Sequence, residues 1–239
     1  MNINDLYDRI VLINLVERPD KLEHAKKQLE FANITNYDIY SAVKFDWSGT
    51  ISMLMTLNKC GQFNYNTNPN EFSCALSHYN VIKKAYLEGV KRLFIFEDDI
   101  CFHNDYNKYI SSYLNNLPSD TNLLMLSGFI CEDNVPPLEK INEYWKKPKY
   151  MWYACSYGLD RKGMELYLDM QNESLRQADT PLYLMQFNES IVSCCPNVPL
   201  IVQANYLSSD LRETKNFEEN PNYYELGIDY NNYLNYYSK

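Results

Sequence analysis

Histidine is scarce, positive charge is not in excess, and long apolar runs are absent from this chain. Only 3 histidines occur among 239 residues, which argues against a metal site built from several histidines. The 22 Lys and Arg residues against 31 Asp and Glu give a formal net charge of -9. Without a basic surface to neutralise phosphates, the chain is not expected to bind nucleic acid generally, although a local nucleotide site stays open.

The sequence predicts neither a membrane span nor a signal core. No apolar run approaches the roughly 20 residues that cross a bilayer. Asp5 and Asp8 precede the first apolar segment, where a secretory signal would carry basic residues. We therefore expect a cytoplasmic protein, with peripheral contact at the inner membrane face left open.

The seven cysteines do not form a recognisable pattern. Their number is odd and no Cys-x-x-Cys occurs, which argues against a disulfide framework or a common zinc motif. Most are expected to be buried small side chains in a reducing compartment. With 46% hydrophobic residues, the sequence predicts one globular domain over residues 1–239, with an Asn- and Tyr-rich tail from about residue 211.

Strands and helices alternate from the start of the chain. The apolar run 9–15 predicts a buried strand, and 37–43 a second one. Between them we expect a helix that starts at Asp20 as N-cap, with Glu23 in the capping-box position. A strand-helix-strand unit at this spacing predicts a parallel sheet and an α/β fold. No glycine-rich fingerprint follows the first strand, which argues against a dinucleotide-binding enzyme.

The rest of the chain continues the alternation less clearly. Residues 71–88 predict a helix that Gly89 ends, and the strand 91–96 follows it. We expect further strands at 123–127, 151–159 and 199–203, and helices at 160–170, capped by Asp160, and 181–189. Residues 44–70 are interpreted as an excursion over the carboxyl edge of the sheet, and 131–149 as a loop.

The most informative feature is the acidic triplet Glu97-Asp98-Asp99, which ends the apolar run 91–96. Ligands of open α/β sheets bind at the carboxyl ends of strands. Three crowded carboxylates repel one another, and a divalent cation would offset that repulsion. The alternative is a solvated acidic loop, which is common after a strand. Transferases that use nucleotide sugars often need such a cation, because it stabilises the charge growing on the diphosphate leaving group.

Several short blocks stand in order along residues 9–210. They are Asn14-Leu15 with Arg18, Asp20 and Lys21, then residues 40–43, the block 71–78 with Cys74, Ser77 and His78, the acidic triplet, the stretch 153–163, Ala178-Asp179, and 199–203 followed by Ser208. In this order they resemble glycosyltransferase family 25, the lipopolysaccharide-type transferases that include collagen galactosyltransferases. Lys21 stands where Arg is frequent in the family, and Ser73 where Gly is usual.

The resemblance implies a GT-A fold, with a mainly parallel Rossmann-like sheet and a nucleotide-sugar site at its carboxyl edge. It implies transfer of a hexose, usually galactose, from a UDP-sugar to a glycan or protein hydroxyl, with inversion and with Mn²⁺ or Mg²⁺. Asp99 is the first choice for the metal ligand and Glu97 the second. The nucleotide-sugar contacts implied are Asn14, Leu15, Arg18, Ala42, Val43, Ser77 and Asp98.

Each of these residues also has a plainer interpretation. Arg18 could be a solvated turn residue, and Ala42 and Val43 ordinary strand packing. His78 could pack or hold the acidic loop by hydrogen bonds instead of touching the diphosphate. Cys74 is expected in the core.

Inversion needs a general base on the acceptor side of the sugar. Asp179 matches an acidic position of the family and is our choice, although Asp-Thr-Pro is also a good helix start in which Asp179 would be a plain N-cap. No histidine follows His103, so a late metal ligand would have to come from Gln203, Asn205, Asp210 or water.

Two classes of function therefore remain. The first is an active, metal-dependent glycosyltransferase. The second is a catalytically degenerate protein that binds a nucleotide sugar or acts as a scaffold.

Overall fold

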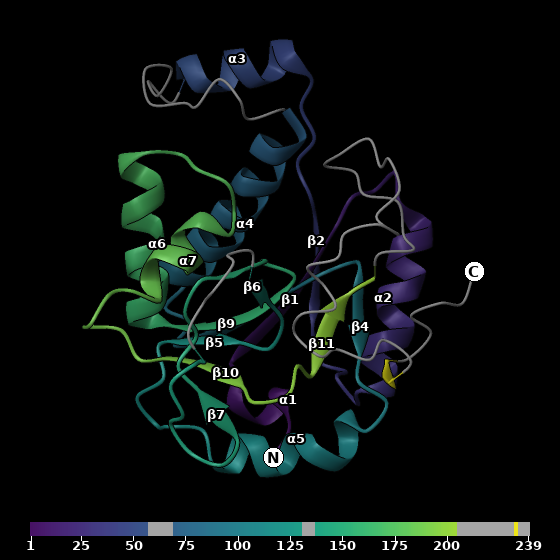
Figure 1. Cartoon of the computed structure of the whole chain (residues 1–239). Coiled ribbons are helices and arrows are strands. Elements are labelled where there is room, and N and C mark those ends of the chain that lie inside the picture. Colours follow the sequence, from purple (N-terminus) through teal and green to yellow (C-terminus); the bar gives the residue numbers. More distant parts are fainter. Residues whose placement is uncertain (57–68, 131–136, 205–231, 234–239) are drawn as a thin grey trace.

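A seven-stranded mixed sheet forms the centre of the protein (Figure 1). The computed structural model describes residues 1–56, 69–130, 137–204 and 232–233. The strand order across the sheet is β2 (Asp38–Ser41), β1 (Arg9–Asn14), β3 (Arg92–Glu97), β9 (Ser156–Asp160), β5 (Leu123–Met125), β10 (Ser193–Pro196) and β7 (Trp145–Lys146). The β2-β1-β3 half is parallel, whereas β9 runs antiparallel to both of its neighbours, β3 and β5. The predicted α/β class is confirmed.

Helices cover both faces of this sheet. Two lie on one face, α2 (Pro19–Phe31) and α5 (Tyr106–Asn115), and three on the other, α4 (Pro69–Leu87), α6 (Arg161–Glu173) and α7 (Thr180–Met185) (Figure 1). The short helix α1 (Ile3–Leu6) precedes β1, and α3 (Trp47–Thr56) extends from the carboxyl edge. Small two-stranded sheets pair β11 (Ile201–Gln203) with β4 (Ile100–Phe102), and β6 (Phe129–Ile130) with β8 (Met151–Trp152).

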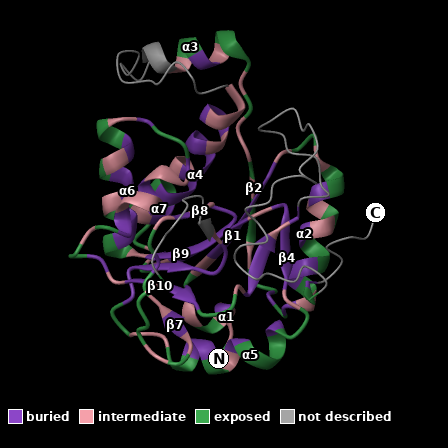
Figure 2. Cartoon of the chain, viewed as in Figure 1, coloured by how far each residue is buried: buried purple, intermediate pink, exposed green. Residues whose placement is uncertain are grey.

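Side-chain alternation along the strands divides the core into two layers. Phe94 and Phe96 of β3 pack with α2 and α5, whereas Leu93 and Ile95 pack with α4 and α6. This follows from the two-residue period of a strand, which needs apolar residues at every position when both faces are covered. Figure 2 shows the buried residues gathered on the strands and on the inward sides of the helices.

Several sequence predictions match the structure closely. The unit β1-α2-β2 is parallel as predicted, and α4 ends before Gly89, which takes a φ of 77°. The predicted Asp160 cap of α6 is confirmed, because its carboxylate accepts the N–H of Gly163 at 2.8 Å. The five cysteines in the described residues are free, and four of them are buried.

Other predictions were wrong in detail. The N-cap of α2 is Arg18 and not Asp20, and Glu23 pairs with Lys27 instead of closing a capping box. Residues 44–70 contain the helix α3, and the loop 131–149 contains β7. The single strand predicted over 151–159 is two strands, β8 and β9, because the backbone bends at Tyr153 with a φ of 93°.

The described residues contain no candidate for a membrane span, since every helix in those ranges is too short or too polar.

The backbone of β9 is closely packed at Gly158, where a larger side chain would not fit without a shift. Gly158 of β9 lies beneath Tyr7, and a Cβ at this position would come within 2.1 Å of the Tyr7 Oη. We expect Gly158→Ala to lower the free energy of unfolding by about 1–3 kcal/mol, because the crowded core must shift. Urea denaturation measures this change. Adding Tyr7→Ala should make the combined cost smaller than the sum of the single costs, and strict additivity would contradict the contact.

Candidate functional site

A pocket of about 150 Å³ opens at the carboxyl ends of β1 and β3, beside the segment that follows β2. Residues of five elements and their connections line it: Ile13, Asn14, Leu15, Lys21, Ala42, Val43, Lys44, Asn70, Ser73, Cys74, Ser77, His78, Glu97, Asp98, Asp99 and Gln203. Nine of the eleven residues predicted for the site are among them, and Arg18 and Asp179 are not.

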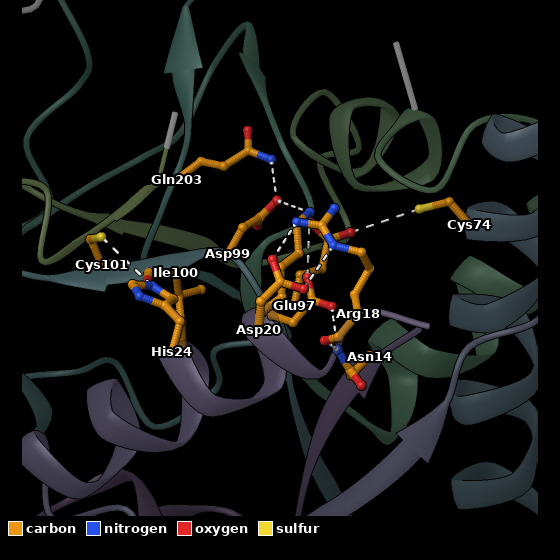
Figure 3. Close-up of polar contacts among 12 residues, drawn as sticks. Asn14, Arg18, Asp20, His24, Cys74, Glu97, Asp99, Ile100, Cys101 and Gln203 are labelled. Carbon is orange, nitrogen blue, oxygen red and sulfur yellow. Dashed lines mark hydrogen bonds and ion pairs between the residues drawn. The ribbon is translucent and has the colours of Figure 1, made fainter. Parts of the chain in front are cut away.

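The acidic triplet lines the pocket, and Glu97 and Asp99 have different polar partners there, Cys74 and Gln203 (Figure 3). Glu97, two residues after Ile95 on the same strand, shares its direction toward α4. Its Oε1 lies 3.0 Å from His78 Nε2. Asp98 and Asp99 instead lie on the side of α2, where both approach Lys21. The metal ligands predicted for the site, Asp99 and Glu97, therefore have different neighbours.

Lys21 is a buried cation between two carboxylates. Its Nζ lies 3.7 Å from Asp98 Oδ1 and 3.5 Å from Asp99 Oδ2, and the residue is only 3% exposed. Lys21 occupies the first turn of α2, which points toward the end of β3. Its ammonium offsets part of the charge of the triplet in a place where water is largely excluded.

Asp98 is held by β1 as well as by Lys21. Asn14 Nδ2 donates to Asp98 Oδ2 at 2.7 Å and also to the carbonyl of Arg18 at 3.1 Å. Burial, followed by the negative charge of Asp99, raises the pKa of Asp98 to about 7, against the opposing effects of Lys21 and Asn14. Asn14 thus joins the end of β1, the turn before α2 and the acidic triplet.

Asp99 has one satisfied oxygen and one unsatisfied oxygen. Gln203 Nε2 donates to Oδ2 at 3.0 Å, so a late strand does reach the triplet (Figure 3). Oδ1 is buried and has no hydrogen-bond partner among the described residues. Burial raises the pKa of Asp99, and the charge of Lys21 opposes that rise. An unpartnered buried carboxylate oxygen is costly, which favours a ligand at this position.

The residues on the α2 side of the triplet fit a hard divalent cation. Carboxylate oxygens are the ligands that Mg²⁺ and Mn²⁺ prefer, and Asp99 Oδ1 is available. Glu97, Asp98 and Asp99 together outnumber the nearby cation Lys21. Of the proposed late partners, Gln203 reaches Asp99, whereas Asn205 and Asp210 lie outside the described residues.

On the α4 side of the triplet, Glu97 belongs to a buried chain of hydrogen bonds with His78 and Tyr157. His78 Nδ1 lies 2.8 Å from Tyr157 Oη, and His78 itself is fully buried. Burial alone would raise the pKa of Glu97, but the hydrogen bond and charge of His78, together with Lys21, leave it below its usual value. Cys74 Sγ approaches the same Glu97 oxygen at 3.7 Å.

Two serines of α4 hold the segment that follows β2, which also lines the pocket. Ser77 Oγ accepts the backbone N–H of Val43 at 2.9 Å, and Ser73 Oγ accepts that of Phe45 at 2.9 Å. The N–H of Ala42 donates to the carbonyl of Asn14 at 2.8 Å. Val43 and Ala42 therefore line the pocket on a backbone that is fixed from two sides.

Leu15 lines the pocket at the turn between β1 and α2, whereas Arg18 of the same turn lies outside the lining. Arg18 Nη2 lies 2.8 Å from Asp20 Oδ2, and this interaction lowers the pKa of Asp20 to about 2. Leu15 is half-buried and lines the pocket directly. Arg18 contributes through its carbonyl to Asn14, while its guanidinium engages Asp20.

Asp179 occupies the N-cap position of α7, but its side chain makes no cap hydrogen bond to that helix. Its carboxylate instead accepts the backbone N–H of Tyr153. Burial, followed by the charge of Glu97, raises the pKa of Asp179, and His78 opposes this. Asp179 is therefore the N-cap residue of α7 by position, without a side-chain cap hydrogen bond, and the charge of Glu97 acts on its carboxylate.

Sequence reasoning missed three residues with direct roles in this arrangement. For Lys21 the sequence indicates only a replacement of Arg, because a lysine in a first helical turn usually points to water. Tyr157 lies inside a strand, and its residue type gives no signal. The prediction of Cys74 in the core is incomplete, because this half-buried residue packs on the core and also lines the pocket, and its spacing of four from His78 places both on one face of α4.

Comparison with known proteins identifies the family. The model of glycosyltransferase family 25, described as LPS biosynthesis protein, matches residues 7–142, more than half of the chain. The chain belongs to glycosyltransferase family 25. The match includes β1, α4 and the whole acidic triplet, whereas the later blocks at 153–163, Ala178-Asp179 and 199–208 lie beyond the region compared.

One curated relative comes from Acanthamoeba polyphaga mimivirus and bears the name putative glycosyltransferase. It is 27% identical over 137 residues, which are 56% of this chain and 42% of the relative. The chain thus spans less than half the length of that relative.

Solved structures show weaker likeness. A glycosyltransferase involved in glycosylation of the major capsid of PBCV-1 has a TM-score of 0.46 and 10% identity, and covers 84% of this chain and 94% of its own. The glycosyltransferase GlyE of Streptococcus pneumoniae TIGR4 has a TM-score of 0.43 and 12% identity, and covers 93% of this chain and 61% of its own.

Removing the buried ammonium tests the charge balance of the site. We expect Lys21→Met to lower the free energy of unfolding by about 3 kcal/mol at neutral pH, because Asp98 and Asp99 lose their nearby cation. Adding Asp98→Asn should recover much of the loss. The matched control is Lys27→Met, an exposed lysine of the same helix, which should change stability by less than about 0.5 kcal/mol. Equal effects of the two substitutions, measured by urea denaturation, would contradict the assignment.

Proposed function

We propose that the protein is a metal-dependent, inverting glycosyltransferase that moves a hexose from a UDP-sugar to a hydroxyl of a glycan or protein. The observation that carries the proposal is the pocket at the carboxyl ends of β1 and β3, where Asn14, Asp98 and Asp99 meet. Family membership supports the reaction class. Galactose as the sugar rests on the habit of the family.

The donor would lie along the wall formed by β1 and the segment after β2. Ala42 and Val43 offer half-buried apolar surface of the kind that receives a flat base. Asp98, held by Asn14, can accept a ribose or sugar hydroxyl. Lys21, which approaches both aspartates of the triplet, would lie beside the diphosphate.

A hard divalent cation, Mn²⁺ or Mg²⁺, would be held by Asp99 through its unpartnered Oδ1, and it would stabilise negative charge on the departing diphosphate. Glu97 could support it only through the oxygen that does not bond His78. Gln203 fixes the orientation of Asp99 by donating to the other oxygen.

Asp179 is the proposed general base. It would take the proton of the acceptor hydroxyl as that oxygen attacks the anomeric carbon from the side opposite the diphosphate. A raised pKa makes a carboxylate a stronger base, and the absence of a cap hydrogen bond to α7 leaves the carboxylate oriented by Tyr153. His78 acts on the donor side by positioning Glu97.

The alternative is a protein that binds a nucleotide sugar without transferring it. A panel of UDP- and GDP-sugars with Mn²⁺, scored by free nucleotide, separates the two. We expect release from one UDP-sugar, and loss of at least 100-fold of that rate in Asp99→Ala because the cation loses its main ligand. Asp105→Ala, an exposed acid before α5, is the control and should keep the rate. Donor binding without release from any sugar would favour the alternative.

The base has a separate test. Asp179→Asn should lower kcat by about 10²–10⁴-fold, because the proton acceptor is lost while the donor pocket is intact. UDP affinity, measured by calorimetry, should stay within a few-fold of the parent. Asp169→Asn on the exposed side of α6 serves as the matched control. An unchanged kcat in Asp179→Asn would remove this residue from the mechanism.

A further inference from the structure

Three different metal-binding groups converge on the α4 side of Glu97. Glu97 Oε1 lies 3.0 Å from His78 Nε2 and 3.7 Å from Cys74 Sγ, and all three donor atoms lie within 4.8 Å of one another. A tetrahedral Zn²⁺ holds neighbouring N, O and S ligand atoms about 3.2–3.7 Å apart. The observed spacing is close to what one ion would require.

Regular elements hold this arrangement. Cys74 and His78 are separated by one turn of α4 and project from the same face. Glu97 is the last residue of β3 and shares the side of Ile95, which packs against α4. Figure 3 shows Cys74 approaching Glu97 from the side opposite Gln203 and Asp99.

A partner for the second nitrogen of His78 is also in place. Metal-bound histidines nearly always use the other ring nitrogen in a hydrogen bond that fixes the ring. His78 Nδ1 lies 2.8 Å from Tyr157 Oη, and both side chains are fully buried. With the proton on Nδ1 and donated to Tyr157, the Nε2 lone pair faces Glu97 and Cys74.

We propose that Cys74, His78 and Glu97 form a binding site for a transition-metal ion of the zinc type, distinct from the hard cation at Asp99. The site supplies three protein ligands, and because all three residues line the pocket, the fourth position faces the pocket. Binding converts the Cys74 thiol to a thiolate and releases one proton to solvent. Neither the ion nor the protein changes oxidation state.

The electrostatic surroundings favour a cation there. The charged side chains that act on Cys74 and Glu97 include the carboxylates of Asp99 and Asp179, with Lys21 as the opposing charge. A bound divalent ion would supply the positive charge that the thiolate needs.

Cobalt provides the test, because a thiolate-bound Co²⁺ gives a sulfur-to-metal charge-transfer band that oxygen ligands do not give. Titration of the chelator-treated full chain should reach one Co²⁺ per chain at this band, and added Zn²⁺ should abolish it. Cys74→Ser should lose the band. Cys101→Ser is the matched control, because Cys101 also lies near a histidine, His24 at 3.9 Å, and should keep it.

A second pair of variants separates this site from the proposed transfer reaction. Asp99→Ala should keep the band even when nucleotide release is lost. Tyr157→Phe should weaken Co²⁺ binding by about 10–100-fold, because His78 loses the partner of Nδ1. Circular dichroism confirms that each variant folds. No band in the parent protein, or a band that survives Cys74→Ser, would overturn the proposal.

Discussion

Repulsion among three consecutive carboxylates is the constraint that shapes the pocket. β3 is buried and delivers Glu97, Asp98 and Asp99 into a space where the two aspartates are each 8% exposed. Two unit charges 4 Å apart repel by about 4 kcal/mol at an effective dielectric constant near 20. Part of this repulsion is relieved because Glu97 ends β3 on the side of α4, whereas the turn that follows places both aspartates near Lys21 of α2.

The negative charge that remains on the triplet is stabilised by hydrogen bonds and ion pairs from four separate elements. Asn14 comes from β1, Lys21 from α2, His78 from α4 and Gln203 from β11. Each of these side chains reaches the triplet from an element that packs elsewhere on the sheet or on β4. The triplet therefore links the ends of elements that are distant in sequence, and β11, which pairs with β4, contributes Gln203 to it.

The framework of this site could be predicted from the sequence, because buried strands and amphipathic helices leave clear patterns. The positions of β1, α4 and β3 follow from apolar runs, and the place of the triplet follows from β3. The partners of the triplet could not be predicted. Lys21 resembles any surface lysine of a first turn, and its burial depends on how α2 meets β3. Tyr157 reaches His78 only because β9 inserts antiparallel beside β3.

The bend at Tyr153 is another feature that could not be predicted from the sequence, and it brings a backbone N–H to Asp179. A tyrosine with a φ of 93° stores roughly 1–3 kcal/mol of backbone strain, and nothing in its residue type announces it. The bend follows β8, and the Tyr153 N–H donates to Asp179, whose side chain makes no cap hydrogen bond to α7. Burial, followed by the negative charge of Glu97, raises the pKa of Asp179 and makes it more basic. The negative charge of Glu97 is unfavourable within the triplet, but it contributes to the basicity of the proposed base, Asp179. Glu97 and Asp179 are therefore coupled electrostatically.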